Sequence, residues 1–349
     1  MTENKTSKDT RRLNDKTILI TGGTGSFGRH FVKTVLERYQ PGKLIVFSRD
    51  EQKQYEMAQS FDMKTYPCIR YFIGDVRDAE RLEMAMRGAD YVIHAAALKH
   101  VPTAEYNPFE CIRTNVHGAE NIVNAAIRCG VDRVIALSTD KAVNPINLYG
   151  ASKLAADKIF VAANNLSGMN GPKFAVVRYG NVLGSRGSVI PFFKKLIAEG
   201  ATELPVTDKR MTRFWISLQQ GIDFVLDCLA DTEGGEIFIP KIPSMRIVDL
   251  ARVIGPKLSM NEIGIRPGEK LHETLLTTHD ASNALNFDDR YLIRPTGVVK
   301  LESHDYSLGG QPGAKVEDDF AYRSDTNDWW MTDDEIQQCL DDLDWRRFL

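Results

Sequence analysis

Short apolar runs recur through the first half of the chain, and segments with helical patterning separate them. Runs of β-branched and other apolar residues without polar interruptions predict strands that are buried on both faces of a parallel sheet. Their alternation with helices predicts a doubly wound α/β fold of the Rossmann type. The expected strands are 17–21, 43–47, 69–73, 91–94, 133–137 and 174–178, and the expected helices include 26–39, 79–87 and 115–129.

The pattern becomes irregular after Asn181, where prolines and the Gly234-Gly235 pair interrupt the apolar runs. Because such residues end helices and strands, we expect a smaller lobe here, with some strands returning to the sheet. In the last part of the chain, Thr332 and Glu335 have the spacing of a capping box, which predicts a short helix from Thr332. The expected divisions are a disordered arm (1–15), a Rossmann domain (16–185), a lobe over most of 186–295 and a tail (296–349).

Composition narrows the possible functions. The 349 residues suffice for a dinucleotide-binding domain plus a second lobe, and a net charge of −3 provides no basic field for nucleic acid. The five cysteines are scattered without C-x-x-C spacing, which favours reduced thiols over disulfides or a zinc site. The first residues lack the apolar core of a signal peptide, and no apolar run approaches the roughly 18–20 residues of a membrane helix. We therefore expect a cytoplasmic protein without a metal, membrane or nucleic-acid partner.

A glycine-rich loop follows the first expected strand and precedes the first expected helix, with the spacing G-x-x-G-x-x-G. Glycines let the backbone turn tightly and approach a pyrophosphate, which is held at the helix N-terminus. The position between strand and helix favours this function over an ordinary glycine-rich turn. The residues predicted to contact the cofactor here are Gly22, Thr24, Gly25, Ser26, Phe27 and Gly28.

The end of the second strand predicts which dinucleotide binds. A protein that binds NAD usually has an acidic residue there to hold the ribose hydroxyls. This chain has Arg49, with Lys53 one helical turn later, and two cations can hold the 2′-phosphate of NADP. Asp50 could instead hold the ribose hydroxyls of NAD, and Arg49 and Lys53 could be charged residues on a solvent-exposed surface. We favour NADP. Further cofactor contacts are expected from Asp75 (with the adenine amino group), Val76, Ala95, Lys99, Lys153 and Val182.

Tyr149 and Lys153 are four residues apart, so on a helix they share one face. A neighbouring ammonium lowers the pKa of a phenol towards neutrality, and such a tyrosine can remove a hydroxyl proton while hydride leaves the same carbon. Lys153 can also hold the nicotinamide ribose. Tyr-x-x-x-Lys alone is common by chance, but this pair follows a strand that ends in Ser138-Thr139, in a chain that has the glycine loop.

These features resemble the extended short-chain dehydrogenase/reductase family. The segment 138–153 (STDKAVNPINLYGASK) resembles the inverting UDP-N-acetylglucosamine 4,6-dehydratases that open pseudaminic acid biosynthesis. Epimerases of the wider family have small or neutral residues after the strand-end Ser/Thr, and most sugar-nucleotide dehydratases have Thr-Asp-Glu, whereas this chain has Thr139-Asp140-Lys141. Membrane-bound retaining relatives tend to have Met in place of Tyr149. Further similar segments are 94–108, 178–191, 211–216, 236–245 and 265–273.

The resemblance implies a reaction and assigns catalytic roles, in which Thr139 takes part. Oxidation at carbon 4 of the sugar, with Tyr149 as base, makes the proton on carbon 5 acidic. Lys141 then removes that proton, and Asp140 protonates the departing hydroxyl on carbon 6. At their usual pKa values Lys is charged and Asp ionised, so we expect burial to shift both towards neutral forms. Hydride returns from NADPH to carbon 6, and protonation of carbon 5 from the opposite face gives the L-arabino 4-keto sugar.

The resemblance also implies UDP-N-acetylglucosamine as substrate and a set of contacts for it. Lys99 is expected near both cofactor and substrate, Asn181 near the diphosphate, and residues 185–188 supply backbone donors. Arg266 offers a cation for the diphosphate and Glu269 a carboxylate for the uridine ribose. Each of these groups could also be an ordinary loop charge. The remaining expected contacts are Val189, Thr207, Met211 and Arg213.

Two other functions are compatible with parts of the pattern. A UDP-sugar 4-epimerase would share the glycine loop, Tyr149 and Lys153, but has no use for Asp140 and Lys141 as an acid and base. A non-enzymatic NADP-sensing regulator often loses the catalytic Tyr or Lys, and both are present here. Family members usually self-associate through helices beside the active site, so the resemblance implies a homo-oligomer, either a dimer or a hexamer.

Overall fold

The computed structural model describes residues 12–168, 170–184, 188–298, 304–308 and 310–342, and the first eleven residues of the expected arm lie outside them. Its centre is a ten-stranded sheet. The strands of this sheet are β1 (Thr17–Thr21), β2 (Lys43–Ser48), β3 (Ile69–Ile73), β4 (Tyr91–His94), β5 (Arg133–Thr139), β6 (Lys173–Tyr179), β10 (Ile237–Pro240), β14 (Ala284–Asn286), β15 (Arg290–Ile293) and β18 (Ala314–Lys315).

The strand order is β18-β14-β15-β10-β6-β5-β4-β1-β2-β3. Every neighbouring pair from β3 to β10 is parallel, whereas β15, β14 and β18 are antiparallel additions at one edge. The order 3-2-1-4-5-6 is that of the doubly wound dinucleotide-binding fold, so the predicted fold class is confirmed. The ladder between β5 and β6 continues to the pair Thr139↔Tyr179, two residues past the predicted end of β5, because polar Ser138 and Thr139 still pair through their backbones.

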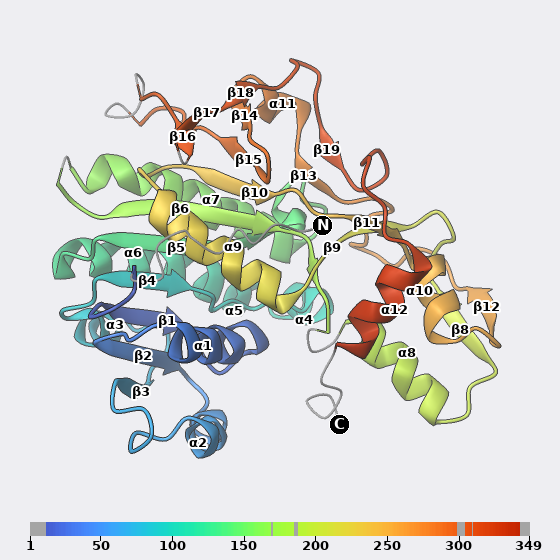
Figure 1. Ribbon diagram of the computed structural model, residues 1–349, viewed down its shortest axis with the longest axis horizontal. Coiled ribbons are helices and arrows are strands. Elements are labelled where there is room, and N and C mark those ends of the chain that lie inside the picture. Colours follow the sequence, from blue (N-terminus) through green and yellow to red (C-terminus); the bar gives the residue numbers. More distant parts are fainter. Residues whose placement is uncertain (1–11, 169, 185–187, 299–303, 309, 343–349) are drawn as a thin grey trace.

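Helices cover both faces of the sheet (Figure 1). The helices α3, α6 and α7 pack against one another in turn on one face, and α1 packs against α9 on the other. The predicted helix over 115–129 begins as α-helix only at Gly118, because a π-helical turn precedes it. These elements are α1 (Ser26–Arg38), α2 (Glu51–Ser60), α3 (Ala79–Met86), α4 (Val101–Tyr106), α5 (Pro108–Ile112), the π-helix η1 (Arg113–His117), α6 (Gly118–Cys129), the 3-10 helix η2 (Asp140–Ala142), α7 (Leu148–Leu166) and α9 (Leu218–Asp231).

A smaller lobe with its own hydrophobic core lies at one end of the sheet (Figure 1). Its core contains Trp215, Met211 and Leu250, together with Ile336 and Leu340 from near the C-terminus. The elements around it are α8 (Val189–Ala198), β8 (Glu203–Val206), β12 (Ser259–Glu262), α10 (Ile247–Ile254), α12 (Asp333–Asp341), and the small sheet of β7 (Asn181–Val182), β9 (Thr212–Ile216) and β11 (Ser244–Arg246).

The two ends of the chain are more integrated than the sequence indicated. Leu13 is 2% exposed and belongs to the main core, so packed structure begins before residue 16. The predicted capping box of Thr332 and Glu335 is present and starts α12, which packs on α10. The tail also contributes β18 to the main sheet and β19 (Tyr322–Arg323), which pairs with β13 (Thr274–Leu276). The described residues 314–341 therefore belong to the sheets and to the lobe and do not form a separate tail. The remaining elements are α11 (Thr278–Ala281), β16 (Ser307–Leu308) and β17 (Gln311–Pro312).

Candidate active site

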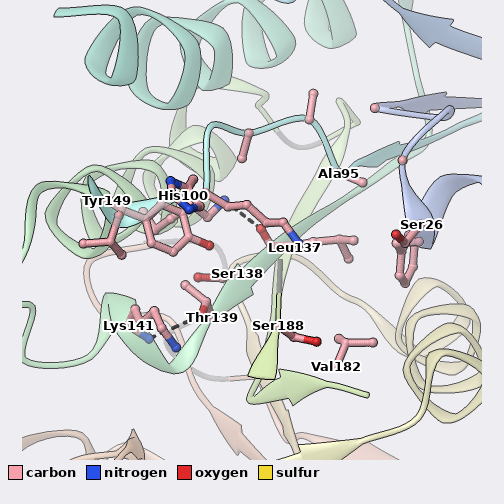
Figure 2. Close-up of a pocket in the computed structure, with 18 of the residues that line it drawn as sticks. Ser26, Ala95, His100, Leu137, Ser138, Thr139, Lys141, Tyr149, Val182 and Ser188 are labelled. Carbon is pink, nitrogen blue, oxygen red and sulfur yellow. Dashed lines mark hydrogen bonds between the residues drawn. The ribbon is translucent and has the colours of Figure 1, made fainter. Parts of the chain in front are cut away.

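A cavity of about 820 Å³ lies along the carboxyl ends of the parallel strands, and residues such as Arg213 and Trp215 line its other side. This edge of an open α/β sheet is where ligands bind in such folds. Figure 2 shows Tyr149, Ser138, Thr139 and Lys141 gathered on one side of the cavity, with Ser26 and Val182 on the other. The predicted site residues that line it are Gly22, Thr24, Gly25, Ser26, Phe27, Gly28, Arg49, Lys53, Val76, Ala95, Lys99, Thr139, Lys141, Tyr149, Lys153, Asn181, Val182, Arg213, Arg266 and Glu269.

The glycine loop forms one end of this cavity and can accept a dinucleotide. Gly25 is the N-cap of α1 and makes no side-chain capping bond, and the first turn of α1 has no acidic residue. The helix N-terminus is therefore available to a phosphate group. Gly22 has a φ of +64°, and a Cβ there would lie 2.9 Å from the backbone nitrogen of Ala96. The close approach of two backbones at this point explains why glycine is needed.

We expect Gly22→Ala to destabilise the protein more than Gly88→Ala. Both glycines have positive φ, but a Cβ on Gly88 would meet nothing within 4 Å. Gly88→Ala should cost only the backbone term of about 1–2 kcal/mol. Gly22→Ala adds the clash with Ala96 and should lower the free energy of unfolding by roughly 1–3 kcal/mol more. Urea unfolding of both variants measures the difference, and equal losses would contradict the assigned backbone contact.

The cationic residues at the end of β2 have acidic partners in the structure. Lys53 Nζ lies 2.6 Å from Asp50 Oδ2, and Arg49 Nη1 lies 3.6 Å from Asp75 Oδ2. Asp75 does not line the cavity, and its carboxylate accepts from Arg77 at 2.7 Å. Burial raises the pKa of Asp75, but the bonds from Arg77 and the charge of Arg49 outweigh this, so the pKa is lowered. The neighbouring Val76, rather than Asp75, forms the cavity wall here.

The residues with predicted catalytic roles come from the end of β5, from η2 and from the start of α7 (Figure 2). Thr139 Oγ1 donates to Asp140 Oδ1 at 2.9 Å and accepts from the backbone N–H of Lys141 at 3.4 Å. Lys141 Nζ lies 3.0 Å from the same oxygen of Asp140. Asp140 is fully buried behind these two residues and does not line the cavity. Its side chain can therefore reach a ligand only through Thr139 or Lys141.

Tyr149 and Lys153 lie on the same face of α7, and both are buried. Lys153 Nζ donates to the carbonyl of Leu137 at 2.7 Å. Asn147 caps the helix by accepting from the N–H of Gly150, which fixes where the first turn begins. The Thr139 hydroxyl, which donates to Asp140, also lowers the pKa of Tyr149, so this threonine lies between the phenol and the Asp140–Lys141 pair.

Two electrostatic expectations from the sequence are wrong. Burial raises the pKa of Tyr149 to about 12, against smaller lowering effects from the Lys141 charge and the Thr139 hydroxyl. The charge that lowers this pKa is thus on Lys141, whereas Lys153 was expected to supply it. Burial lowers the pKa of Lys141, but the carboxylates of Asp140 and Glu273 outweigh it and the pKa is raised. Lys141, which is only partly buried, is therefore an ammonium and not the neutral amine that was expected.

Three predicted substrate contacts do not line the cavity. Met211 is 3% exposed and belongs to the core of the lobe, and Val189 packs against the same core. Thr207 is also buried outside the cavity wall. Apolar and small polar side chains at such positions cannot be assigned to a core or a ligand from sequence alone. Of the expected backbone donors in 185–188, residues 185–187 lie outside the described residues, and Ser188 lines the cavity.

Several polar atoms of the cavity wall are buried without a hydrogen-bond partner, and two of the residues that carry them had no predicted role. Buried polar atoms are nearly always paired, so atoms of this kind in a cavity indicate a polar ligand. Glu273 and Trp215 carry two of them, and both lie in segments that were noted only for their resemblance to the dehydratases. The atoms are Asn181 Oδ1, Ser188 Oγ, Trp215 Nε1, Glu269 Oε2 and Glu273 Oε2.

The described part of the chain contains no cluster of three or more side chains suited to hold a metal ion. The same residues include no helix with the length and apolar character required to cross a membrane.

Comparison with known proteins assigns the family. The model of the family described as polysaccharide biosynthesis protein matches residues 18–295. This chain belongs to that family. Within it, the chain is 58% identical over 330 residues to a protein of Campylobacter jejuni subsp. jejuni serotype O:2 named UDP-N-acetylglucosamine 4,6-dehydratase (inverting), covering 94% of this chain and 98% of that protein. It is 42% identical over 317 residues to a protein of Rickettsia canadensis named UDP-glucose 4-epimerase, covering 88% and 90%.

Solved structures of related proteins have the same fold. Pen from Bacillus thuringiensis superposes with a TM-score of 0.85 at 36% identity, covering 97% of this chain and all of that chain. The dTDP-glucose 4,6-dehydratase DesIV from Streptomyces venezuelae, with NAD and DAU bound, superposes with a TM-score of 0.65 at 25% identity, covering 73% and 86%. The fold and length of this member of the polysaccharide biosynthesis protein family are thus shared with sugar-nucleotide enzymes.

Proposed function

We propose that this protein is a UDP-N-acetylglucosamine 4,6-dehydratase that inverts carbon 5 and forms UDP-2-acetamido-2,6-dideoxy-β-L-arabino-hexos-4-ulose. The observation that carries the proposal is that Tyr149, Thr139 and Lys141 line one cavity, while Thr139 and Lys141 both hydrogen-bond Asp140 behind them. Such a wall offers one base for an oxidation and a separate acid and base for an elimination. The 58% identity to the Campylobacter dehydratase over nearly the whole chain supports the same reaction.

A nicotinamide dinucleotide, here proposed to be NADP, would supply the hydride acceptor for carbon 4 and return that hydride to carbon 6. The uncapped start of α1 and the glycine loop would hold its pyrophosphate. Lys153 would hold the nicotinamide ribose, and Val76, Ala95 and Val182 would line its path along the cavity.

Three side chains of this protein would then each carry out one proton transfer. Tyr149 takes the proton of the carbon-4 hydroxyl. Lys141 takes the carbon-5 proton, which requires that it first become a neutral amine. Asp140 protonates the departing carbon-6 hydroxyl through Thr139, because the Thr139 hydroxyl can accept from Asp140 and donate to a ligand at the same time.

We expect Arg49→Ala to weaken NADP binding and to leave NAD binding nearly unchanged. Arg49 is about half exposed and faces the cavity, where a 2′-phosphate could replace the long 3.6 Å contact with Asp75. A hydrogen bond to a charged group contributes about 1.5–3 kcal/mol, so the dissociation constant for NADP should rise roughly tenfold or more. Titration with each nucleotide measures this, with the exposed Arg87→Ala as control. Equal losses for both nucleotides would contradict the assignment of NADP.

The substrate nucleotide is proposed to lie between the sheet edge and the lobe. Asn181 and Trp215 face each other across the β7–β9 pair and offer an unpaired amide oxygen and an unpaired indole N–H. Arg266 and Lys99 supply positive charge for a diphosphate, and the free oxygen of Glu269 suits a ribose hydroxyl.

We also propose a cytoplasmic homo-oligomer that acts at the start of pseudaminic acid or related 6-deoxy amino sugar biosynthesis. Support for self-association comes from Tyr106 and Phe109, which are 87% and 78% exposed on α4 and α5 beside the active site. Large apolar side chains that are exposed together commonly mark an interface.

A UDP-sugar 4-epimerase is the second candidate, because the Rickettsia relatives carry that name. Both reactions begin with oxidation at carbon 4, but only the dehydratase uses an acid and base for elimination. The Asp140–Lys141 pair beside Tyr149 therefore favours the dehydratase.

Proton NMR with UDP-N-acetylglucosamine in deuterated water, without added cofactor, tests the proposal. A new methyl signal on a 4-keto sugar, with deuterium at carbon 5 and L-arabino couplings, is the expected result. D-xylo couplings would overturn the inversion, and UDP-N-acetylgalactosamine would identify an epimerase. No change in the spectrum would overturn the assignment of this substrate.

A further inference from the structure

Glu273, which had no predicted role, lies beside Lys141 in the wall of the cavity. Its side chain is only 2% exposed, and its Oε1 atom lies 3.5 Å from Lys141 Nζ. The other oxygen, Oε2, is buried without a hydrogen-bond partner. Lys141 thus lies between two buried carboxylates, since its Nζ is also 3.0 Å from Asp140 Oδ1.

Two cationic side chains lie close to the Glu273 carboxylate. Arg213 on β9 approaches Glu273 Oε1 to 3.6 Å, and Lys270 approaches Oε2 to 4.0 Å. Both cations attract the Glu273 carboxylate, because opposite charges at such distances stabilise each other. The other titratable groups that face Lys141 are Tyr149 on α7 and Lys99 after β4.

The backbone of Glu273 is held by the C-terminal part of the chain. Its N–H donates to Ser324 Oγ at 2.9 Å, and the N–H of Ser324 donates to its carbonyl at 2.9 Å. Ser324 is fully buried and also hydrogen-bonds Thr212 Oγ1 at 2.7 Å. The pairing of β13 with β19 continues this connection. Residues near the C-terminus therefore fix the position of a carboxylate in the active site.

We propose that Glu273 is the positioning counter-ion of the proton-transfer centre and keeps one proton on the Asp140–Lys141 pair. The proposal rests on the proposed dehydratase function. The amine and the carboxyl group share one proton, so a single transfer prepares both catalytic forms. The raised pKa of Lys141, to which Glu273 contributes, agrees with this arrangement.

The proton balance closes over one elimination. An N–H bond of the Lys141 ammonium breaks and an O–H bond forms on Asp140, which leaves a neutral amine and a carboxylic acid. The amine then takes the proton from carbon 5, and the acid passes its proton through Thr139 to the departing hydroxyl, which leaves as water. Lys141 is again an ammonium and Asp140 again a carboxylate. Glu273 exchanges no proton in this cycle and contacts the ammonium at the start and the end.

Glu273→Gln tests the proposal through the pH dependence of turnover. The amide keeps the size of the side chain and an acceptor oxygen but removes the charge. Without that charge the pair loses its shared proton at lower pH, so the alkaline limb of the kcat profile should move down by about 1–3 pH units. We therefore expect the ratio of variant to wild-type kcat to fall as pH rises from about 7 to about 10. A purely structural role would lower kcat by the same factor at every pH.

Two further variants keep the test decisive. Glu273→Asp retains the charge, so its ratio to wild type should not change with pH even if kcat is lower. Ser324→Ala removes a hydrogen bond that holds the backbone of Glu273, so it should shift the alkaline limb of the kcat profile in the same direction by a smaller amount. This variant replaces Glu273→Gln in the test if Glu273→Gln does not fold. Glu262→Gln, on the lobe surface, is the matched control. The wild type could form the 4-keto product while the ratios of variant to wild-type kcat for Glu273→Gln and Ser324→Ala stay constant with pH. That result would overturn the role of Glu273 but leave the proposed function standing. Absence of 4-keto product from the wild type would overturn the proposed function and the inference with it.

Discussion

Tyr149→Phe is expected to lower turnover of UDP-N-acetylglucosamine by about 10²–10⁴-fold, the usual contribution of a general base. The substitution removes only the hydroxyl that takes the carbon-4 proton. The ring is 8% exposed and packs with Ala104 and Cys111, and Phe can keep these contacts. The loss should therefore appear in oxidation itself, measured as the absence of reduced cofactor absorbance after substrate is added. Because burial raises the pKa of Tyr149 to about 12, activity of the wild type should rise with pH above neutrality as more phenolate forms.

The control for this variant is Tyr71→Phe. The Tyr71 hydroxyl donates to the carbonyl of Phe61 at 2.8 Å, far along the chain from the catalytic residues, so the same chemical change is made outside the site. Both variants should unfold at nearly the wild-type temperature, and only Tyr149→Phe should lose activity. Normal turnover by Tyr149→Phe would show that the site does not begin its reaction with this oxidation.

The parallel sheet and the position of the glycine-rich loop between β1 and α1 were predictable because their signals are local. Each strand is a short apolar run, and the residue that matters follows directly at its carboxyl end, as Gly22 follows β1 and Thr139 ends β5. The spacing of Tyr149 and Lys153 likewise predicts a shared helix face without any knowledge of the rest of the chain. Such arguments need only one element at a time.

The electrostatics of the site could not be predicted in this way, because they depend on residues far apart in the chain. Lys141 and Glu273 are separated by 132 positions and meet only after the lobe packs on the sheet. Burial alone suggested a neutral Lys141, but two carboxylates beside it reverse the direction of the pKa shift. Met211 shows the opposite error, since a residue inside a similar-looking motif belongs to the core of the lobe.

Lys141→Gln is expected to separate the two halves of the reaction. The amide can still lie between Asp140 and Glu273 but cannot accept the carbon-5 proton, so elimination should slow by about 10²–10⁴-fold. Oxidation at carbon 4 should continue, more slowly than in the wild type, because the Lys141 charge also lowers the pKa of Tyr149. Stopped-flow absorbance should show reduced cofactor that forms and persists, while NMR shows no methyl product.

The stability of this variant must be measured alongside its kinetics. Asp140 and Glu273 are almost completely buried, and removal of the cation between them leaves Asp140 without a cationic partner, whereas Glu273 keeps Arg213 and Lys270. Loss of one partner from a buried ion pair costs roughly 3–5 kcal/mol, so the unfolding temperature should fall clearly, whereas Lys158→Gln on the exposed side of α7 should change neither stability nor activity. A folded Lys141→Gln protein that forms no reduced cofactor would show that Lys141 acts in oxidation and that the two steps do not use separate groups. Persistent reduced cofactor without product would instead assign the elimination to Lys141, because only the step after oxidation would then lack its base.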